Sequence, residues 1–202
     1  SFSIPYFMSK DFYVGYGWYR KHLSLTPEDL EKKLFLEFEG VFQEAEIFVN
    51  GKLAGSHTGG YTGFSVDISS YVRKRDNLIA IRVNNLWRPD VAPRAGEHVF
   101  SGGIYRNVHL VKTKHCHIAW YGTFITTPDL EENNGQSTRI KIETEIINEC
   151  RESGIYRLLT HILDRNGNRV AEVETTDTIA AGSDRKFVQF TSPVYQPDLW
   201  NP

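Results

Sequence analysis

The chain has 202 residues, of which 24% are charged, and its formal net charge is −2. This balance excludes the positive field with which proteins attract nucleic acid or a membrane surface. No apolar run approaches the roughly 20 residues that span a bilayer, and two cysteines are too few for a disulfide framework. We therefore expect one large or two ordinary domains, with no nucleic-acid partner and no membrane partner.

The start of the chain carries little information about targeting. Ser1 to Lys10 lacks the basic start and the apolar run of a signal peptide. The chain also begins without Met and in the middle of a strand-like phrase. We therefore expect it to be an excised piece of a longer protein.

Short alternations of apolar and polar residues, the period of a half-buried strand, run through the first half of the chain. Between two of them stands Asn50-Gly51, the strongest short hairpin signal in a sequence. Gly59-Gly60 marks a further bend, and 69–76 is a polar turn with room for one helical turn. The predicted strands are 18–25, 34–39, 45–50, 52–58, 64–68, 78–83 and 104–111.

A connection of eighteen residues, 84–101, separates the last two of these strands. Connections this long in a compact domain are usually functional or disordered. Mixed aromatic and charged residues argue against disorder, and Pro89 and Pro93 stiffen the segment. We interpret it as a binding loop held between two strands. Its candidate contact residues are Trp87, Arg88, Asp90, Arg94, Glu97 and His98.

The second half repeats the alternation with different spacing. A turn at 164–168 joins two of its strands as a hairpin, and no stretch of the chain keeps the 3.6-residue period of a helix well. The sequence therefore predicts an all-β protein with domains at 1–113 and 114–202, each truncated at its outer edge. The predicted strands of the second domain are 118–126, 139–148, 155–164, 169–176 and 186–191.

Four phrases of the first half resemble, in order and spacing, the sugar-binding domain of glycoside hydrolase family 2. They are GWYRK at 17–21, VNGK at 49–52, GGYTGF at 59–64 with Asp67, and GGIYRNV at 102–108. This family contains β-galactosidases, β-glucuronidases and β-mannosidases, and the resemblance covers 11–112. The second half is similar to the immunoglobulin-like domain that follows in the family, through the weaker markers Asn148, 164–167 and 197–202.

The resemblance implies a jelly-roll (galactose-binding-like) β-sandwich followed by an immunoglobulin-like β-sandwich. In the family these domains precede a (β/α)₈ barrel that carries two catalytic glutamates, and this chain stops before it. The chain is then the non-catalytic front of a retaining glycosidase, with β-galactosidase as the first candidate activity. Its expected partners are a carbohydrate substrate and the catalytic barrel, which it would brace, and no cofactor is expected.

The same resemblance points to Glu97, which stands six residues before Gly103. In the family an acidic residue at this spacing reaches the active site of the barrel and hydrogen-bonds sugar hydroxyls. That residue is usually aspartate, so the longer glutamate is a departure. His98, Arg88 and Trp87 are expected on the same rim. The alternatives are a solvated carboxylate for Glu97 and loop-stabilising or domain-contact roles for the others.

Other combinations of reactive residues do not predict a catalytic site, a metal site or a disulfide. Asn148-Glu149 looks like an acid/base pair of the family's barrel, but no βα repeat surrounds it. His115 and His117 share a strand face, yet no third ligand follows at a recognisable spacing, so no metal site is expected. Cys116 and Cys150 become neighbours if their strands pair antiparallel, and we favour free thiols.

The motif residues themselves have structural interpretations. Asn50-Gly51 supplies a type I′ turn, and Gly59-Gly60 and Gly102-Gly103 allow bends or close backbone approach. Arg20 and Arg106 need a carboxylate or backbone carbonyls, for which Asp67 or Glu39 are candidates. The large aromatic residues should fill the space between the sheets, so that Trp18→Ala costs about 3–5 kcal/mol. These aromatic residues are Trp18, Tyr19, Phe64 and Tyr105.

Two further functions stay open beside the glycosidase front. One is a free-standing carbohydrate-binding module that uses Trp87, Tyr61 and Glu97, and the other is a structural spacer with no ligand. We expect the isolated chain not to bind galactose, glucuronate or mannose measurably, because a pocket without its floor buries too little of a ligand.

Overall fold

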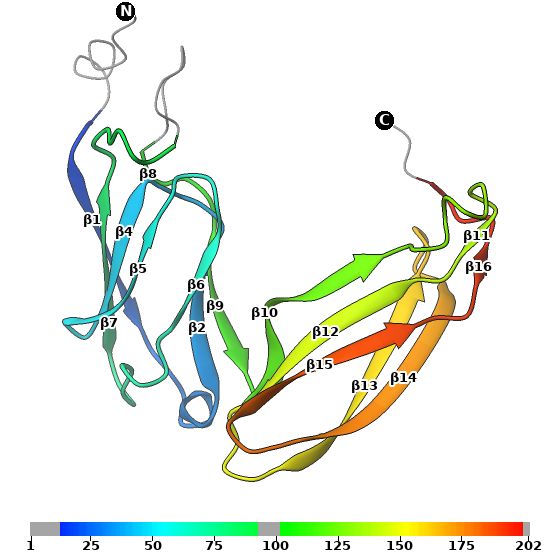
Figure 1. The fold of residues 1–202 in the computed structure, drawn as a ribbon. Helices are drawn as coiled ribbons and strands as arrows, with labels where there is room; N and C mark the ends of the chain where they lie inside the picture. The colour runs from blue at the N-terminus through cyan, green and yellow to red at the C-terminus, as the bar shows by residue number, and fades with distance from the viewer. Residues whose placement is uncertain (1–12, 93–101, 200–202) are drawn as a thin grey trace, which may run out of the picture. The chain divides into compact units, whose positions relative to one another are not determined.

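The computed structural model describes residues 13–92 and 102–199. Within this part the protein is all-β, as predicted, apart from a 3₁₀ turn, η1, at Asp29–Glu31. The chain divides into two compact units, Ser1–Lys114 and His115–Pro202 (Figure 1). The described segments contain no helix that is long and apolar enough to cross a membrane. Assignment of the units to a jelly-roll and an immunoglobulin-like domain stays a prediction.

The first unit consists of antiparallel sheets that enclose one core. The larger sheet has the order β1-β7-β4-β5, the second has the order β6-β2-β9, and β3 pairs with β8. Gly55 in β5 shows how closely the two larger sheets approach, because a β-carbon there would lie 2.8 Å from Val66 in β6. The strands are β1 Tyr16–Leu23, β2 Lys33–Phe38, β3 Val41–Phe42, β4 Glu44–Val49, β5 Lys52–Thr58, β6 Phe64–Asp67, β7 Asn77–Asn84, β8 Gly103–Ile104 and β9 Val108–Thr113.

The period of two places alternate residues of these strands in the core. Leu34 in β2 and Ile47 in β4 are both 0% exposed. Phe38 stacks on Phe64 from the neighbouring strand, with ring centroids 4.5 Å apart. The core therefore lies between the two larger sheets, where the alternation predicted it.

The glycine motifs adopt the predicted conformations. Asn50 has φ 52° and Gly51 has φ 82°, the left-handed pair that a type I′ hairpin requires. The Asn50 side chain also donates to Asn77 Oδ1 at 2.9 Å, which anchors the turn to the start of β7. A β-carbon on Gly60 would lie 2.3 Å from the ring of Phe42, so close backbone approach is confirmed there.

The predicted role of the aromatic residues is only partly correct. Phe64 is buried, but Trp18, Tyr19 and Tyr105 are 47%, 42% and 37% exposed. β1 is an edge strand, and Trp18 lies opposite Arg82 on the outward face of the sheet. The side chain of Trp18 contacts Phe48, with ring centroids 5.8 Å apart, instead of filling the core. The predicted placement of Trp18 in the core is therefore wrong, and we expect a smaller cost for Trp18→Ala than a core residue would give.

The predicted carboxylate pairing changes for Arg20, whereas for Arg106 it holds in part, because the pKa of Glu39 is lowered by its hydrogen bond with His109 and also by the charge of Arg106. Arg20 lies over the ring of Trp18, 5.3 Å from its centroid. Asp67 pairs with Lys33 at 2.5 Å, and Glu39 contacts His109 at 2.9 Å. Both carboxylates thus have partners on the neighbouring strand of their own sheet.

The second unit has a smaller core. Its sheets are β10-β12-β15, β13-β14 and β11-β16, and the predicted hairpin between β13 and β14 is confirmed by their antiparallel pairing. Ile146, Ile179 and Phe187 form the buried cluster. The strands are β10 Cys116–Thr126, β11 Ser137–Thr138, β12 Lys141–Asn148, β13 Gly154–Leu163, β14 Arg169–Ile179, β15 Ser183–Phe190 and β16 Val194–Tyr195.

β10 and β12 pair antiparallel, and Cys116 stands opposite Asn148. The Tyr156 hydroxyl donates to Asn148 Oδ1 at 3.1 Å and lies 4.0 Å from Cys150 Sγ. Burial, followed by the hydrogen bonds with the two thiols, raises the pKa of Tyr156 to about 12. Both cysteines are free and lie around one tyrosine hydroxyl.

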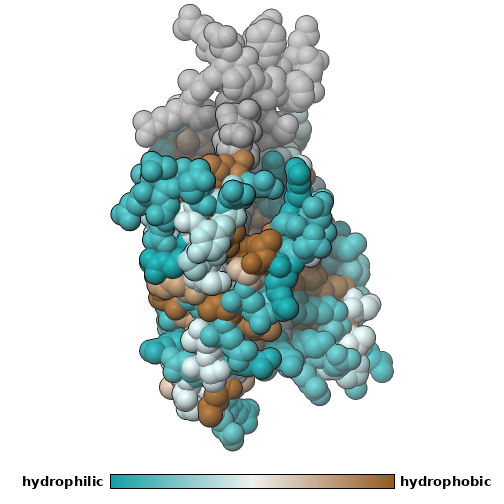
Figure 2. All heavy atoms as spheres, turned by 90° about the vertical axis from the view of Figure 1, so that its right-hand side faces the viewer, coloured by the Kyte–Doolittle hydropathy of each residue, from teal (hydrophilic) through white to brown (hydrophobic). Residues whose placement is uncertain are grey.

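A small core leaves apolar side chains at the surface. Phe124 in β10 and Ile155 in β13 are 64% and 75% exposed. On the face shown in Figure 2, hydrophobic side chains reach the surface in several places among hydrophilic ones. Exposed apolar residues are common on proteins and identify no partner by themselves.

Replacing Ile47 with Ala should lower the free energy of unfolding of the first unit by about 2–5 kcal/mol, because the change leaves a cavity in a fully buried site. Trp18→Ala should lower it by less than about 1.5 kcal/mol, because the half-exposed ring loses mainly an aromatic contact. Urea unfolding followed by circular dichroism measures both. A Trp18 variant as unstable as the Ile47 variant would contradict the outward placement of the ring.

Candidate functional site

The long connection crosses from one sheet to another. It leaves β7 of the β1-β7-β4-β5 sheet after Asn84 and enters β8, which pairs with β3. The predicted strand 104–111 is wrong as a single element, because it divides into β8 and β9 in different sheets. Between them the backbone turns at Asn107, whose carbonyl accepts from Glu39 N at 3.1 Å. The connection therefore lies at an edge where two sheets meet.

Two of the four predicted contact residues lie in the described part of this loop. Trp87 is 61% exposed, and Arg88 stands beside it at the base of the loop. Glu97 and His98 lie outside the described residues, as does Arg94. The contact of any of these residues with a sugar stays a prediction.

Arg88 joins the loop to β4. Its guanidinium donates to the carboxylate of Asp90, with Nε 3.0 Å from Oδ1, and to that of Glu44. The hydrogen bonds with Asp90 and then with Glu44 raise the pKa of Arg88 above its usual value. This is the loop-stabilising role that was the alternative for Arg88.

Further polar contacts fasten the same part of the loop. Asn84 Nδ2 donates to Glu44 Oε2 at 2.6 Å, and Leu86 N donates to Asn84 Oδ1 at 3.0 Å. The side chain of Gln43 donates to the Leu86 carbonyl, while Val91 is buried. The base of the loop is thus held on β3 and β4 by side chains as well as backbone.

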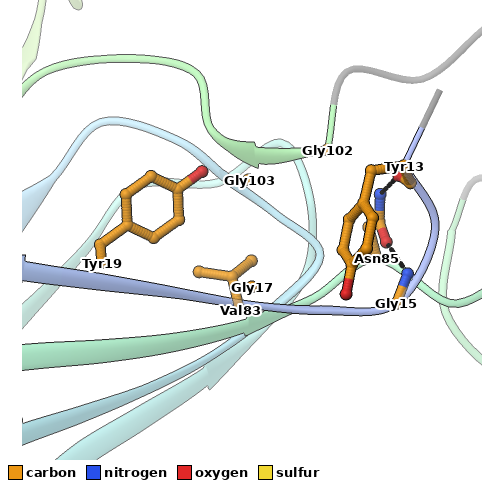
Figure 3. A pocket seen from close by; sticks show the side chains of 8 residues that line it. All are labelled: Tyr13, Gly15, Gly17, Tyr19, Val83, Asn85, Gly102 and Gly103. Atoms are coloured by element: carbon orange, nitrogen blue, oxygen red, sulfur yellow. Dashed lines mark hydrogen bonds between the residues drawn. The ribbon is translucent and has the colours of Figure 1, made fainter.

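A cavity of ≈ 260 Å³ lies where the start of the connection, at Asn85, meets its end, at Gly102 (Figure 3). Tyr13 and Tyr19 give it aromatic walls, and glycine backbone forms much of the rest. Such a lining offers apolar ring surface together with backbone and amide polar groups, the mixture found in small-molecule sites. The cavity is lined by Tyr13, Gly15, Gly17, Tyr19, Val83, Asn85, Gly102 and Gly103.

Asn85 organises this cavity. Its Oδ1 accepts from Gly15 N at 2.7 Å, and its Nδ2 donates to the Tyr13 carbonyl at 2.9 Å, as the dashed lines in Figure 3 show. The residue is only 8% exposed. A β-carbon on Gly102 would lie 2.2 Å from Asn85 Nδ2. Gly102 is therefore required where the connection passes over the amide.

Sequence reasoning singled out Gly17, Gly102 and Gly103 as motif residues but missed Tyr13, Gly15 and Asn85. The available signal was an asparagine directly after a buried strand, where its amide can satisfy backbone groups. Its partners are 70 and 72 residues away in the chain, so no local pattern reveals them.

The residues that line the cavity support binding rather than bond cleavage. Glycoside hydrolysis needs two carboxyl groups, and none of the eight lining residues carries one. Over residues 13–92 and 102–199, no group of three or more His, Cys, Asp or Glu side chains is arranged to hold a metal ion. The chemistry that these eight residues offer is hydrogen bonding and aromatic contact.

Gly102→Ala should displace the Asn85 amide and lower the free energy of unfolding by about 1–3 kcal/mol, because a buried polar group loses its partner. Gly17→Ala is the matched control, since this glycine lines the same cavity but has no atom within 4 Å of an added β-carbon. Urea unfolding of both variants measures the difference. Equal stabilities would contradict the close approach of Gly102 to Asn85.

Comparison with known proteins identifies the family. The model of the glycosyl hydrolases family 2 sugar binding domain matches residues 5–114. A β-galactosidase from Bacteroides ovatus is 34% identical over 93% of this chain and 21% of its own length. A β-glucuronidase from Formosa agariphila is 34% identical over 92% of this chain and 20% of its own length.

Comparison with solved structures finds the same kinds of enzyme as the sequence comparison. A β-glucuronidase from Bacteroides uniformis superposes with a TM-score of 0.86 at 33% identity, over 95% of this chain and 23% of that one. The chain thus spans about a fifth of the length of the curated relatives it matches. The family model covers more than half of the 202 residues, and the chain therefore belongs to glycoside hydrolase family 2.

Proposed function

We propose that this chain is the non-catalytic N-terminal portion of a retaining glycosidase that hydrolyses β-galactosides. The observation that carries the proposal is the match of residues 5–114 to the family's sugar binding domain. The relatives are about five times longer than the region they share with this chain. The catalytic carboxylates would then belong to a barrel in the remainder of the polypeptide.

In this proposal the loop 84–101 contributes to the substrate pocket while the two sandwiches brace the barrel. The anchoring of the loop base supports the first part, because Arg88 and Asn84 hold it on Glu44. A contact residue carried by a fixed base loses less freedom on binding than one on a free loop. Glu97 is the residue we assign to a sugar hydroxyl, by its spacing before Gly103.

A β-glucuronide is the second candidate substrate. It is supported by the relatives described as β-glucuronidases, one by sequence and one by structure. Parallel assays of the intact polypeptide on nitrophenyl β-galactoside and β-glucuronide separate the two. Proton NMR of the first-formed product tests the retaining mechanism, because retention yields the β-anomer.

The alternative is a function without catalysis, either a free-standing carbohydrate-binding module or a structural spacer. The reading frame beyond Pro202 distinguishes these from a glycosidase. A continuation of about 250 residues with alternating strand and helix patterns would support the proposal. A stop codon at that point would favour the alternative.

Glu97→Ala in the intact enzyme should lower kcat/KM by roughly tenfold or more, because a charge-assisted hydrogen bond to a hydroxyl is lost. Glu132→Ala is the control, since Glu132 is an exposed carboxylate of the second unit. Kinetics on both nitrophenyl glycosides measure the effect. Values for Glu97→Ala that match the parent on both substrates would remove Glu97 from the site.

A further inference from the structure

The outward face of the β1-β7-β4-β5 sheet carries side chains that the core does not use. Antiparallel register arranges them in rows across the strands, and we refer to two adjacent rows as the outer face. Neighbouring positions along the same strands, such as Ile47 and Ile81, are buried in the core. The rows are Tyr16, Asn84, Glu44 and Thr58, and Trp18, Arg82, Glu46 and Ser56.

The outer face is hollowed. A depression of ≈ 220 Å³ lies over the middle of the rows, which is smaller than the roughly 300 Å³ at the lower end of drug-sized pockets. The depression therefore has room for one small chemical group of a ligand rather than for a whole large ligand. The depression is lined by Tyr16, Glu44, Ala45, Glu46, Ser56, His57, Thr58, Arg82 and Asn84.

The polar groups of this depression are held in place by one another. Arg82 Nη2 lies 2.5 Å from Glu46 Oε2, and Glu44 accepts from Asn84 at 2.6 Å and from Arg88. The side chains of Arg82 and Glu46 are nevertheless 40% and 34% exposed. Planar groups that are already ordered and still accessible lose little freedom when they bind a ligand.

Tyr16 lines the depression, and Trp18 lies two residues further along β1 on the same face of the strand. Tyr16 and Trp18 are 51% and 47% exposed. Arg82 lies 5.2 Å from the centroid of the Tyr16 ring, and Phe48 contacts Trp18. Outward residues two apart on a strand are separated by about 7 Å, so the two rings offer apolar surface to successive units of a chain-like ligand.

The charges of the site are balanced. The carboxylates of Glu44 and Glu46 face the guanidinium groups of Arg88 and Arg82. Burial lowers the pKa of His57, which disfavours the charged form of its imidazole. An anionic group in the depression would approach two carboxylates whose partner cations are already paired. Arg20 lies beside the depression, over the ring of Trp18. Within the depression itself, charge therefore favours a neutral unit rich in hydroxyl groups.

The geometry points to a binding site for a neutral oligosaccharide on the outer face, with one sugar unit in the depression and the next against Trp18. A pyranose has a C–H face that packs on an aromatic ring and a rim of hydroxyls that both donate and accept. Glu46 and Arg82, whose side chains are partly exposed, supply the complementary acceptors and donors. The contacts extend over two units, so the expected failure of single sugars to bind agrees with this site.

This inference deepens the proposed function by assigning a saccharide site to the sandwich, but its test does not use hydrolysis. The chain itself is titrated with a neutral β-linked galactose tetramer and with a glucuronate-containing hyaluronan tetrasaccharide, up to about 10 mM. Tryptophan fluorescence and calorimetry follow binding. We expect saturable binding of the neutral tetramer, with a fluorescence change, and at least about tenfold weaker binding of the acidic one.

Three substitutions test whether the tetramer binds to the outer face or to another exposed aromatic side chain. Trp18→Ala should weaken binding of the neutral tetramer by about tenfold or more, and Tyr16→Ala should weaken it as well. Trp120→Ala is the matched control, because Trp120 is 43% exposed on the second unit, and its affinity should equal that of the parent. Thermal unfolding confirms that each variant is folded.

Absence of binding, preference for the acidic tetrasaccharide, or full affinity in both outer-face variants would overturn the inference. Each of these results concerns the chain alone and would leave the proposed glycosidase function standing. Conversely, an intact polypeptide that cleaves neither nitrophenyl glycoside would refute the proposed function and leave a measured saccharide affinity in place.

Discussion

The first unit depends on the register with which β4 lies between β7 and β5. Ile47 stands opposite Ile81 and Gly55 in this register, and all three turn toward the second sheet. A slip by one residue would exchange the two faces, placing Glu44 and Glu46 in the core and the isoleucines in water. Burying unpaired carboxylates costs several kcal/mol each, so one arrangement of the strands is strongly preferred. The Asn50-Gly51 turn sets the pairing of Val49 with Lys52, and a register shift between Ile47 and Phe48 then brings Ile47 opposite Gly55.

That register also explains why Glu44 connects the two surfaces that we propose to bind saccharide. As the first residue of β4 it lies on the outward side, opposite Asn84 at the end of β7. Its carboxylate receives the Asn84 amide and the Arg88 guanidinium, and thereby holds the base of the loop 84–101. The same carboxylate lines the depression of the outer face. The base of the loop and the outer face therefore share one ion-paired side chain, that of Glu44.

Much of the architecture could be predicted from short patterns. The strand 52–58 coincides with β5, and most other strands of both units lie within a few residues of their predicted positions. β3, β11 and β16 were missed because each has only two residues, too short for an alternation to be recognised. The run 104–111 was predicted as one strand, yet Ile104 pairs with β3 while Val108 to Val111 pair with β2 in another sheet. Alternation of apolar and polar residues indicates that a segment is extended, but it does not indicate which strand the segment pairs with.

By itself the sequence determined the all-β class, the hairpin turns and the family, because these follow from local periodicity, from glycine conformations and from motifs close together in the chain. Only the tertiary structure decided that Trp18 faces outward, that Asn85 joins Tyr13 to the end of β7, and that Arg88 pairs with Glu44. The physical reason is that alternation defines two faces of a strand without saying which one is covered. Coverage, and every hydrogen bond between residues distant in sequence, depends on how the sheets pack against each other.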